Sequence, residues 1–171
     1  MVQKNEAQKE QLEKILKKIK VIYGAIPPQM EFLGNIEVDY LKMFLTAVLR
    51  IAKHPHIEPD LFAFIRLHIA FKEDYPYCKM FNTKILLAKG YTQKQLNDVI
   101  TDIASVPFNE KHQILAIKSI KAIYGSKLFS KEDFDQLYNL GWTQKDVFDV
   151  IDHAGTIFRN GRILTTYAIK D

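Results

Sequence analysis

The stretch Gly90-Tyr-Thr-Gln-Lys-Gln-Leu-Asn-Asp-Val-Ile100 decides the fold, because it returns as Gly141-Trp-Thr-Gln-Lys-Asp-Val-Phe-Asp-Val-Ile151 with seven matches in eleven positions. Each copy contains a Gly, which can end one helix in the left-handed region, and a Thr two residues later, which can cap the next helix. The duplicated joint therefore predicts two related helix pairs.

The composition is typical of a globular protein that does not enter a membrane. The 171 residues are 47% hydrophobic and 26% charged, and no apolar run approaches the ~20 residues of a membrane span. The polar N-terminus does not resemble a secretion signal, and the lone Cys78 cannot form an internal disulfide. We expect one domain in a reducing cytoplasm, with no membrane partner.

The net charge of +4 raises the question of a nucleic-acid surface. The basic residues near the N-terminus alternate with Glu6, Glu10 and Glu13 around an apolar stripe, which indicates the solvated face of a helix. We therefore expect no nucleic-acid partner. The lysines of this region are Lys4, Lys9, Lys14, Lys17, Lys18 and Lys20.

Helical periodicity runs along nearly the whole chain and strand alternation is absent, which predicts an all-α bundle of about eight helices. The expected helices span about 4–23, 36–53, 59–73, 76–89, 93–105, 109–124, 130–141 and 144–160. Pro27 and Pro28 predict an extended segment after the first helix. The run from Leu61 to Phe71 is apolar almost all round and is expected at the centre of the fold.

The expected helices divide the chain into an N-terminal extension and two repeat copies. The extension covers about 1–24, and the copies cover about 76–105 and 129–160. A single helix pair cannot bury both of its apolar faces, so related pairs pack on each other or on another subunit. We therefore expect a homo-oligomer.

Cys78 is the candidate reactive group, because it lies two residues after Pro76, in the first turn of an expected helix. The helix dipole contributes ~0.3 to 1 kcal/mol there, which lowers a thiol pKa from about 8.5 to no less than about 7.8. A nearby cation would have to lower it further, and Lys79 and His68 are the candidates, whereas Asp74 opposes them. The alternative is that Cys78 is a small apolar residue packed in a helix.

The segment from Leu61 to Ile103 resembles the alkylhydroperoxidase D-like (AhpD-like) and carboxymuconolactone decarboxylase family. That family has an apolar helix, a Cys-x-x-Cys-x-x-x-His motif on the next helix, then a Gly and a capped helix. The resemblance rests on Tyr75-Pro-Tyr-Cys78, on Asn82, on Leu86-Leu-Ala-Lys-Gly-Tyr-Thr92, and on Leu137 to Ile151 followed by Phe158-Arg-Asn160. It implies the AhpD-like helical fold.

The resemblance also implies roles for particular positions. In the family's peroxidases the second Cys attacks peroxide, the first Cys resolves the product as a disulfide, and a Glu and the His relay protons. Cys78 matches the attacking Cys, whereas Tyr75, Asn82 and Ala63 occupy the positions of the resolving Cys, the His and the Glu. A two-cysteine cycle is therefore excluded, and an oxidised Cys78 would need an external thiol reductant.

Two side chains are candidates for a substitute proton relay. His68 lies ten residues before Cys78, and Tyr77 precedes it directly. His68 also falls on an apolar stripe, where a hydrogen-bonded core histidine is the alternative, and His153 has the same alternative.

Two functions from different classes remain open. The first is a single-cysteine peroxidase or thiol redox protein that uses Cys78, His68 and Tyr77. The second is a catalytically inactive helical oligomer that binds a small apolar ligand or a protein partner. His54, His56 and Glu58 could offer metal ligands, but Pro55 separates the histidines in a short loop, so we expect neither a metal nor a cofactor. The decarboxylase branch is disfavoured, because the helix after Pro76 supplies no His or Glu.

Overall fold

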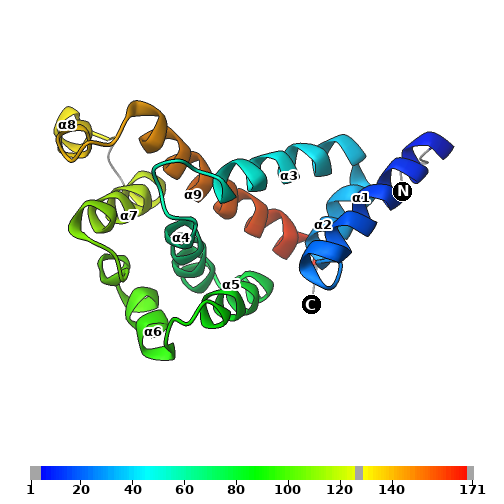
Figure 1. The fold of residues 1–171 in the computed structure, drawn as a ribbon, viewed down its shortest axis with the longest axis horizontal. Coiled ribbons are helices and arrows are strands. Elements are labelled where there is room, and N and C mark those ends of the chain that lie inside the picture. Colours follow the sequence, from blue (N-terminus) through cyan, green and yellow to red (C-terminus); the bar gives the residue numbers. More distant parts are fainter. Residues whose placement is uncertain (1–4, 126–128, 169–171) are drawn as a thin grey trace.

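The computed structural model describes residues 5–125 and 129–168, and these residues are all-α, as predicted (Figure 1). They form nine α-helices and one short 3-10 helix, η1. The bounds are α1 Glu6–Tyr23, α2 Pro28–Ile36, α3 Val38–Ala52, α4 Pro59–Lys72, α5 Pro76–Ala88, α6 Gln93–Thr101, η1 Ile103–Ser105, α7 Glu110–Tyr124, α8 Lys131–Asn139 and α9 Gln144–Thr166.

The duplicated joint has the same geometry in both copies. Gly90 and Gly141 adopt the left-handed region with φ of 93° and 81°, a conformation that favours Gly. The next residue donates its backbone N–H to a carbonyl five residues back, over 3.2 Å in each copy. Thr92 and Thr143 then cap α6 and α9 through capping boxes. The repeated sequence therefore builds two helix pairs, α5 with α6 and α8 with α9.

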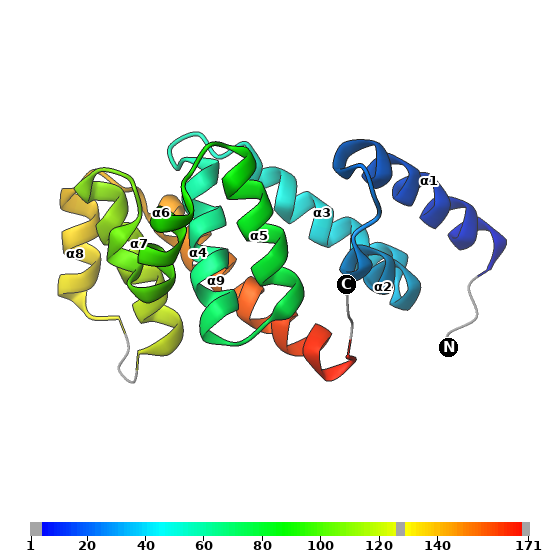
Figure 2. The same ribbon diagram turned by 90° about the horizontal axis from the view of Figure 1, so that it is seen from below.

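Helix α4 lies at the centre of the larger group of helices, between α5 and α9 (Figure 2). Every residue from Leu61 to Ala70 is buried except Arg66, which is partly exposed. A helix that is apolar all round is stable in water only where neighbours cover every face, and α5, α6, α7 and α9 supply that cover. The predicted central position of this helix is confirmed.

Helices α1 to α3 have a second, smaller core, separate from the core around α4. Figure 1 shows α1 and α2 at the opposite end of the molecule from α6 and α8, with α9 running between the two ends. The Phe32 ring of α2 contacts the Tyr167 ring beyond the end of α9, with centroids 5.1 Å apart. The N-terminal helices therefore pack against the C-terminal end of α9.

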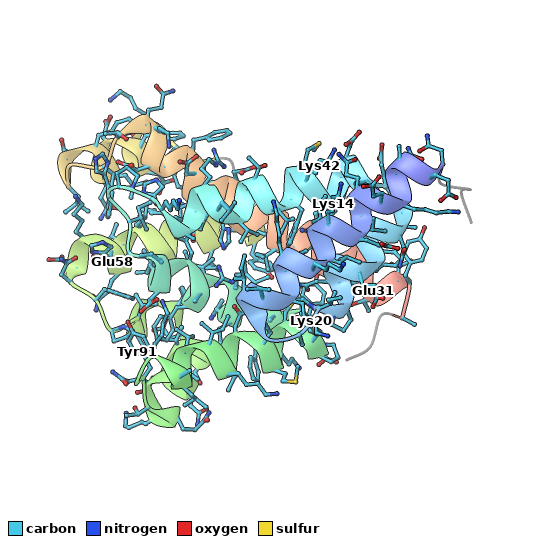
Figure 3. The ribbon with its side chains drawn as sticks, turned by 45° about the vertical axis from the view of Figure 1, so that its right-hand side comes forward. Lys14, Lys20, Glu31, Lys42, Glu58 and Tyr91 are labelled. Atoms are coloured by element: carbon cyan, nitrogen blue, oxygen red, sulfur yellow. The ribbon has the colours of Figure 1, made fainter. Side chains whose placement is uncertain are left out.

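The lysines of α1 form an exposed face, as expected from the sequence. Figure 3 shows Lys14 and Lys20 projecting from α1, and both are exposed. Lys14 pairs with Glu10 one turn earlier, at 2.6 Å. Lys4 lies outside the described residues. No helix in residues 5–125 or 129–168 combines the length and the apolar character that crossing a bilayer requires.

Three element boundaries differ from the predictions. The expected extended segment after Pro27 was wrong, because Pro27 is the extended N-cap residue and Pro28 already starts α2, at a position where a helix tolerates proline. The helix expected to reach residue 105 ends at Thr101, because Asp102 is extended and its side chain accepts from the N–H of Ala104 to start η1. Helix α9 continues to Thr166, beyond the expected end at 160.

Candidate functional site

A cavity of about 270 Å³ lies between the N-terminal helices and the larger group of helices. Residues from α2, α3, α4, α5 and α9 line it, and most of the lining is apolar. This volume is close to the lower end of the ~300 to 1,000 Å³ typical of small-molecule sites. The apolar wall includes Met30, Leu33, Phe44, Ile157 and Leu164.

Cys78 lies in the first turn of α5, as predicted, and its side chain lines the cavity. Cys78 is partly exposed and lies on the cavity wall, so a molecule in the cavity can contact this residue. Tyr77 also lines the cavity, and its ring stacks on Phe81 with centroids 5.6 Å apart. Lys79 instead forms an ion pair with Asp74. The structure thus brings Cys78 and Tyr77 together at the cavity.

Arg66 connects the two helices that flank the cavity. Its Nε donates to the Oδ1 of Asn82 on α5 over 2.7 Å, and its guanidinium lies 3.3 Å from Nε2 of His153 on α9. Asn82 in turn donates from Nδ2 to the carbonyl oxygen of Cys78 over 2.8 Å. All four residues line the cavity. The Asn82 side chain, one helical turn after Cys78, therefore links the positive charge of Arg66 to the backbone of Cys78.

His153 is neutral at neutral pH. Burial lowers the pKa of its imidazole to about 3, and the Arg66 guanidinium is the second cause. Since the guanidinium only donates, Nε2 of His153 accepts, and the backbone of Phe62 hydrogen-bonds the same ring. His153 therefore orients Arg66 and does not carry a proton to the thiol in this arrangement.

His68 does not line the cavity. It is 7% exposed, and its Nδ1 donates to the carbonyl of Val99 on α6 over 2.8 Å. This is the hydrogen-bonded core arrangement that the sequence offered as the alternative to a relay. The structure therefore separates His68 from Cys78 and Tyr77.

The loop between α3 and α4 contains His54 and His56, the two histidines considered as metal ligands. His54 Nδ1 accepts the backbone N–H groups of His56 and Ile57, over 3.2 and 3.0 Å. The His56 ring lies 3.1 Å from the Asp146 carboxylate, which also belongs to the capping box of α9 with Thr143. Among the residues that the structure describes, no three His, Cys, Asp or Glu side chains are grouped to hold a metal ion.

The fold matches solved structures, although no family model matches the sequence and no curated protein matches it. An uncharacterized peroxidase-related protein from Silicibacter sp. TM1040 aligns with a TM-score of 0.81 at 12% identity, over 94% of this chain and 84% of that chain. The AhpD core of an alkylhydroperoxidase, an uncharacterized peroxidase-related protein from Ralstonia eutropha JMP134, aligns with a TM-score of 0.79 at 14% identity, over 94% and 85%. The chain has the AhpD-like fold.

The AhpD-like fold brings together the positions that the sequence resemblance singled out. Ala63, Cys78 and Asn82 all line the cavity, at the positions matched to the family's Glu, attacking Cys and His. Tyr75, at the resolving position, is 3% exposed and donates from its hydroxyl to the carbonyl of Phe158 over 3.1 Å. Three of the four positions therefore line the cavity, and of their side chains only the Cys78 thiol can act as a nucleophile.

Sequence reasoning did not predict that Arg66 and Asn160 line this cavity. The signal for Arg66 was a lone positive charge inside a helix that is otherwise buried from Leu61 to Ala70. Asn160 is 9% exposed, and its Nδ2 is buried without a hydrogen-bond partner among the described residues. Asn160 belongs to the Phe158-Arg-Asn160 segment of the sequence resemblance, but that segment assigned it no role, and the final helix was expected to end there.

Proposed function

We propose that this protein is a single-cysteine peroxidase that reduces apolar hydroperoxides and is restored by an external thiol. The observation that carries the proposal is Cys78 on the wall of an apolar cavity that Arg66 also lines, with Asn82 linking the Arg66 guanidinium to the Cys78 carbonyl. The peroxidase-related proteins that share the fold are consistent with this chemistry.

The reaction begins when the Cys78 thiolate attacks the distal oxygen of the hydroperoxide. An S–O bond forms, the O–O bond breaks, and the remaining alkoxide takes a proton and leaves as an alcohol. The resulting sulfenic acid condenses with one external thiol to give a mixed disulfide and water. A second external thiol then releases Cys78, so the two thiols supply both electrons and leave as a disulfide.

Arg66 has two roles in this proposal. Its charge stabilises the Cys78 thiolate in a cavity with a mostly apolar lining, where a charge interaction is stronger than in bulk water. It also faces the developing negative charge on the leaving oxygen. Arg66 thus takes the place that the sequence offered to Lys79 and His68, and Tyr77 can give the alkoxide its proton from the same wall.

The test measures consumption of cumene hydroperoxide with dithiothreitol as the reductant. We expect catalytic loss of the peroxide by the native protein and none above background in Cys78→Ser. Thr83→Ala is the matched control, because Thr83 lies on the same helix but outside the cavity lining, and it should retain full activity. Equal rates for the native protein and Cys78→Ser would end the proposal.

The second candidate is a catalytically inactive protein that binds a small apolar ligand in the same cavity. It is favoured by the neutral His153 and by Ala63 and Asn82, because none of these groups relays a proton at neutral pH. This candidate predicts that an apolar alcohol binds, whereas cumene hydroperoxide is not consumed and the Cys78 thiol is not trapped by dimedone after peroxide treatment.

We also propose that the protein is a homo-oligomer. Large apolar side chains are exposed on the N-terminal helices, with Val21 at 85%, Ile22 at 70% and Met43 at 67%. Large apolar side chains with this degree of exposure are typical of a subunit contact. Light scattering after size-exclusion chromatography should give a multiple of the 19.9 kDa chain mass, and a monomer at micromolar concentration would contradict this proposal.

A further inference from the structure

Asn160 of α9 brings a buried hydrogen-bond donor to the cavity wall. It is 9% exposed, and its Nδ2 has no hydrogen-bond partner within residues 5–125 and 129–168. Its Oδ1 accepts from Nε of Arg159 over 3.4 Å, so Nδ2 is the remaining polar atom of the side chain. A buried N–H group without an acceptor is costly, and native proteins keep few of them. An oxygen of a ligand in the cavity would supply the acceptor.

Asn160 lies on the part of α9 that packs against the start of α5. Tyr75, the N-cap residue of α5, donates from its hydroxyl to the carbonyl of Phe158. Its ring packs so closely on α9 that a Cβ at Gly161 would lie 2.0 Å from it. Cys78 follows Tyr75 by three residues, which is about one helical turn. Asn160 and Cys78 therefore line the cavity from the same region of contact between the two helices.

The charged side chains that line the cavity already have partners, within the part of the chain that the structure describes. Arg50 pairs with Asp152, which also lines the cavity, and Lys89 pairs with Asp60. Arg66 is engaged with side chains of both α5 and α9, and in the proposed reaction its charge acts on the thiolate and on the leaving oxygen. An ionised head group would therefore lose its hydration in an apolar cavity without a free counter-charge. A neutral ligand avoids this cost.

We propose that Asn160 selects the substrate, a neutral organic hydroperoxide, by donating a hydrogen bond from Nδ2 to its distal oxygen. The apolar wall contacts the carbon skeleton, and the Cys78 thiolate attacks the oxygen that Asn160 holds. The S–O bond forms as the O–O bond breaks, and the leaving alkoxide, which faces Arg66, takes a proton and departs as an alcohol. This inference rests on the proposed function, since it takes the Cys78 cavity as the substrate site.

The test measures binding by isothermal titration calorimetry to the full chain carrying Cys78→Ser, which cannot turn over. The three probes share one carbon skeleton. Cumene hydroperoxide carries the hydroperoxide, tert-butylbenzene carries a methyl group in its place, and α,α-dimethylphenylacetate carries a carboxylate there. We expect the carboxylate to bind Cys78→Ser at least roughly ten-fold more weakly than the hydroperoxide, because the cavity offers no free counter-charge.

Asn160→Leu, added to Cys78→Ser, tests the donor directly, because leucine has a similar size and no N–H group. We expect it to weaken cumene hydroperoxide by roughly ten-fold and to leave tert-butylbenzene bound at least as tightly. Asn97→Leu is the matched control, because it makes the same change at an exposed position of α6 that does not line the cavity. It should bind all three probes as Cys78→Ser does.

The stability of the ligand-free protein separates a ligand-binding role of Asn160 from a structural one. Asn160→Leu replaces an unpaired buried donor with an apolar group, so the midpoint of urea unfolding should stay the same or rise. A clear fall in this midpoint, or a variant that does not fold, would contradict the inference, because Asn160 would then serve the fold.

Two binding results would also overturn the inference. One is an equal effect of Asn160→Leu on cumene hydroperoxide and tert-butylbenzene, and the other is a carboxylate that binds Cys78→Ser as tightly as the hydroperoxide. Failure of the proposed function has a different signature. Asn160→Leu would then still discriminate between the two uncharged probes, whereas the native protein would consume no peroxide.

Discussion

Two glycines of α9 should respond in opposite directions to the same substitution. A Cβ at Gly161 would lie 2.0 Å from Cε2 and 2.2 Å from Cδ2 of Tyr75, whereas a Cβ at Gly155 would lie 3.6 Å from Cδ1 of Ile123. The first distance is a steric clash and the second is an ordinary contact. Gly161→Ala should therefore destabilise the protein, while Gly155→Ala should stabilise it.

The magnitude follows from the packing of the Tyr75 ring. The ring is 3% exposed and its hydroxyl bonds to Phe158, so it cannot move away without losing contacts. Overpacking costs about 1 to 3 kcal/mol, and a lost hydrogen bond costs about 0.5 to 1.5 kcal/mol. Alanine in a helix returns about 0.8 to 1.0 kcal/mol relative to glycine. We expect Gly161→Ala to lose about 0.5 to 3.5 kcal/mol and Gly155→Ala to gain up to about 1 kcal/mol.

Urea unfolding followed by circular dichroism measures both changes, provided that the slopes agree between variants. In the double variant Gly161→Ala with Tyr75→Leu the ring is absent, so the two substitutions should cost less together than their sum. Cys78 should also alkylate at an altered rate in Gly161→Ala, because Tyr75 caps the N-terminus of α5. If both glycine variants were stabilised equally, the close packing of α5 on α9 would be refuted.

Three further predictions concern charges and caps. The pKa of His153 is about 3 in the folded protein, against 6.5 for a free side chain. The free energy of unfolding should therefore fall as the pH drops from about 6.5 towards 3. His153→Gln should reduce this dependence on pH, which urea unfolding at a series of pH values measures. Lys118 and Lys121 lower the pKa of Asp133 through ion pairs, so Asp133→Asn should lower the melting temperature at neutral pH. The difference in melting temperature between this variant and the native protein should shrink below about pH 4. A difference that stays constant with pH would contradict the ion pairs. Thr143→Ala should cost about 1 kcal/mol in urea unfolding, because it removes the cap of α9, and an unchanged midpoint would contradict that role.

The fold was predictable from the sequence wherever one local rule decided the outcome. Each repeated joint needs a residue in the left-handed region, which Gly adopts readily, and the Thr two residues later is an extended N-cap residue of the next helix. The sequence alone therefore located the joints at Gly90 and Gly141 correctly. Helix α2 was missed because two adjacent prolines favour both an extended segment and a helix start, and local rules do not choose between them. Packing of α2 against the rest of the N-terminal core decides that case.

The candidate site was only partly predictable, because its parts come from helices far apart in the chain. Cys78 and Tyr77 were found from a local feature, the first turn of a helix that Pro76 opens. The partners of the thiol depend on the arrangement of α4, α5 and α9, which places Arg66 between Asn82 and His153. Proximity in sequence to Cys78 had instead favoured Lys79, which pairs with Asp74.

The central claim is that Arg66 makes Cys78 a reactive thiol inside the cavity. The most direct measurement is the pH dependence of Cys78 alkylation by iodoacetamide, in the native protein and in Arg66→Gln, with dimedone trapping after peroxide treatment. We predict half-maximal alkylation below pH 8 in the native protein, a rise of roughly one pKa unit in Arg66→Gln, and a trapped sulfenic acid in the native protein. A native midpoint above about 8.5, unchanged in Arg66→Gln and with no trapped product, would contradict the claim.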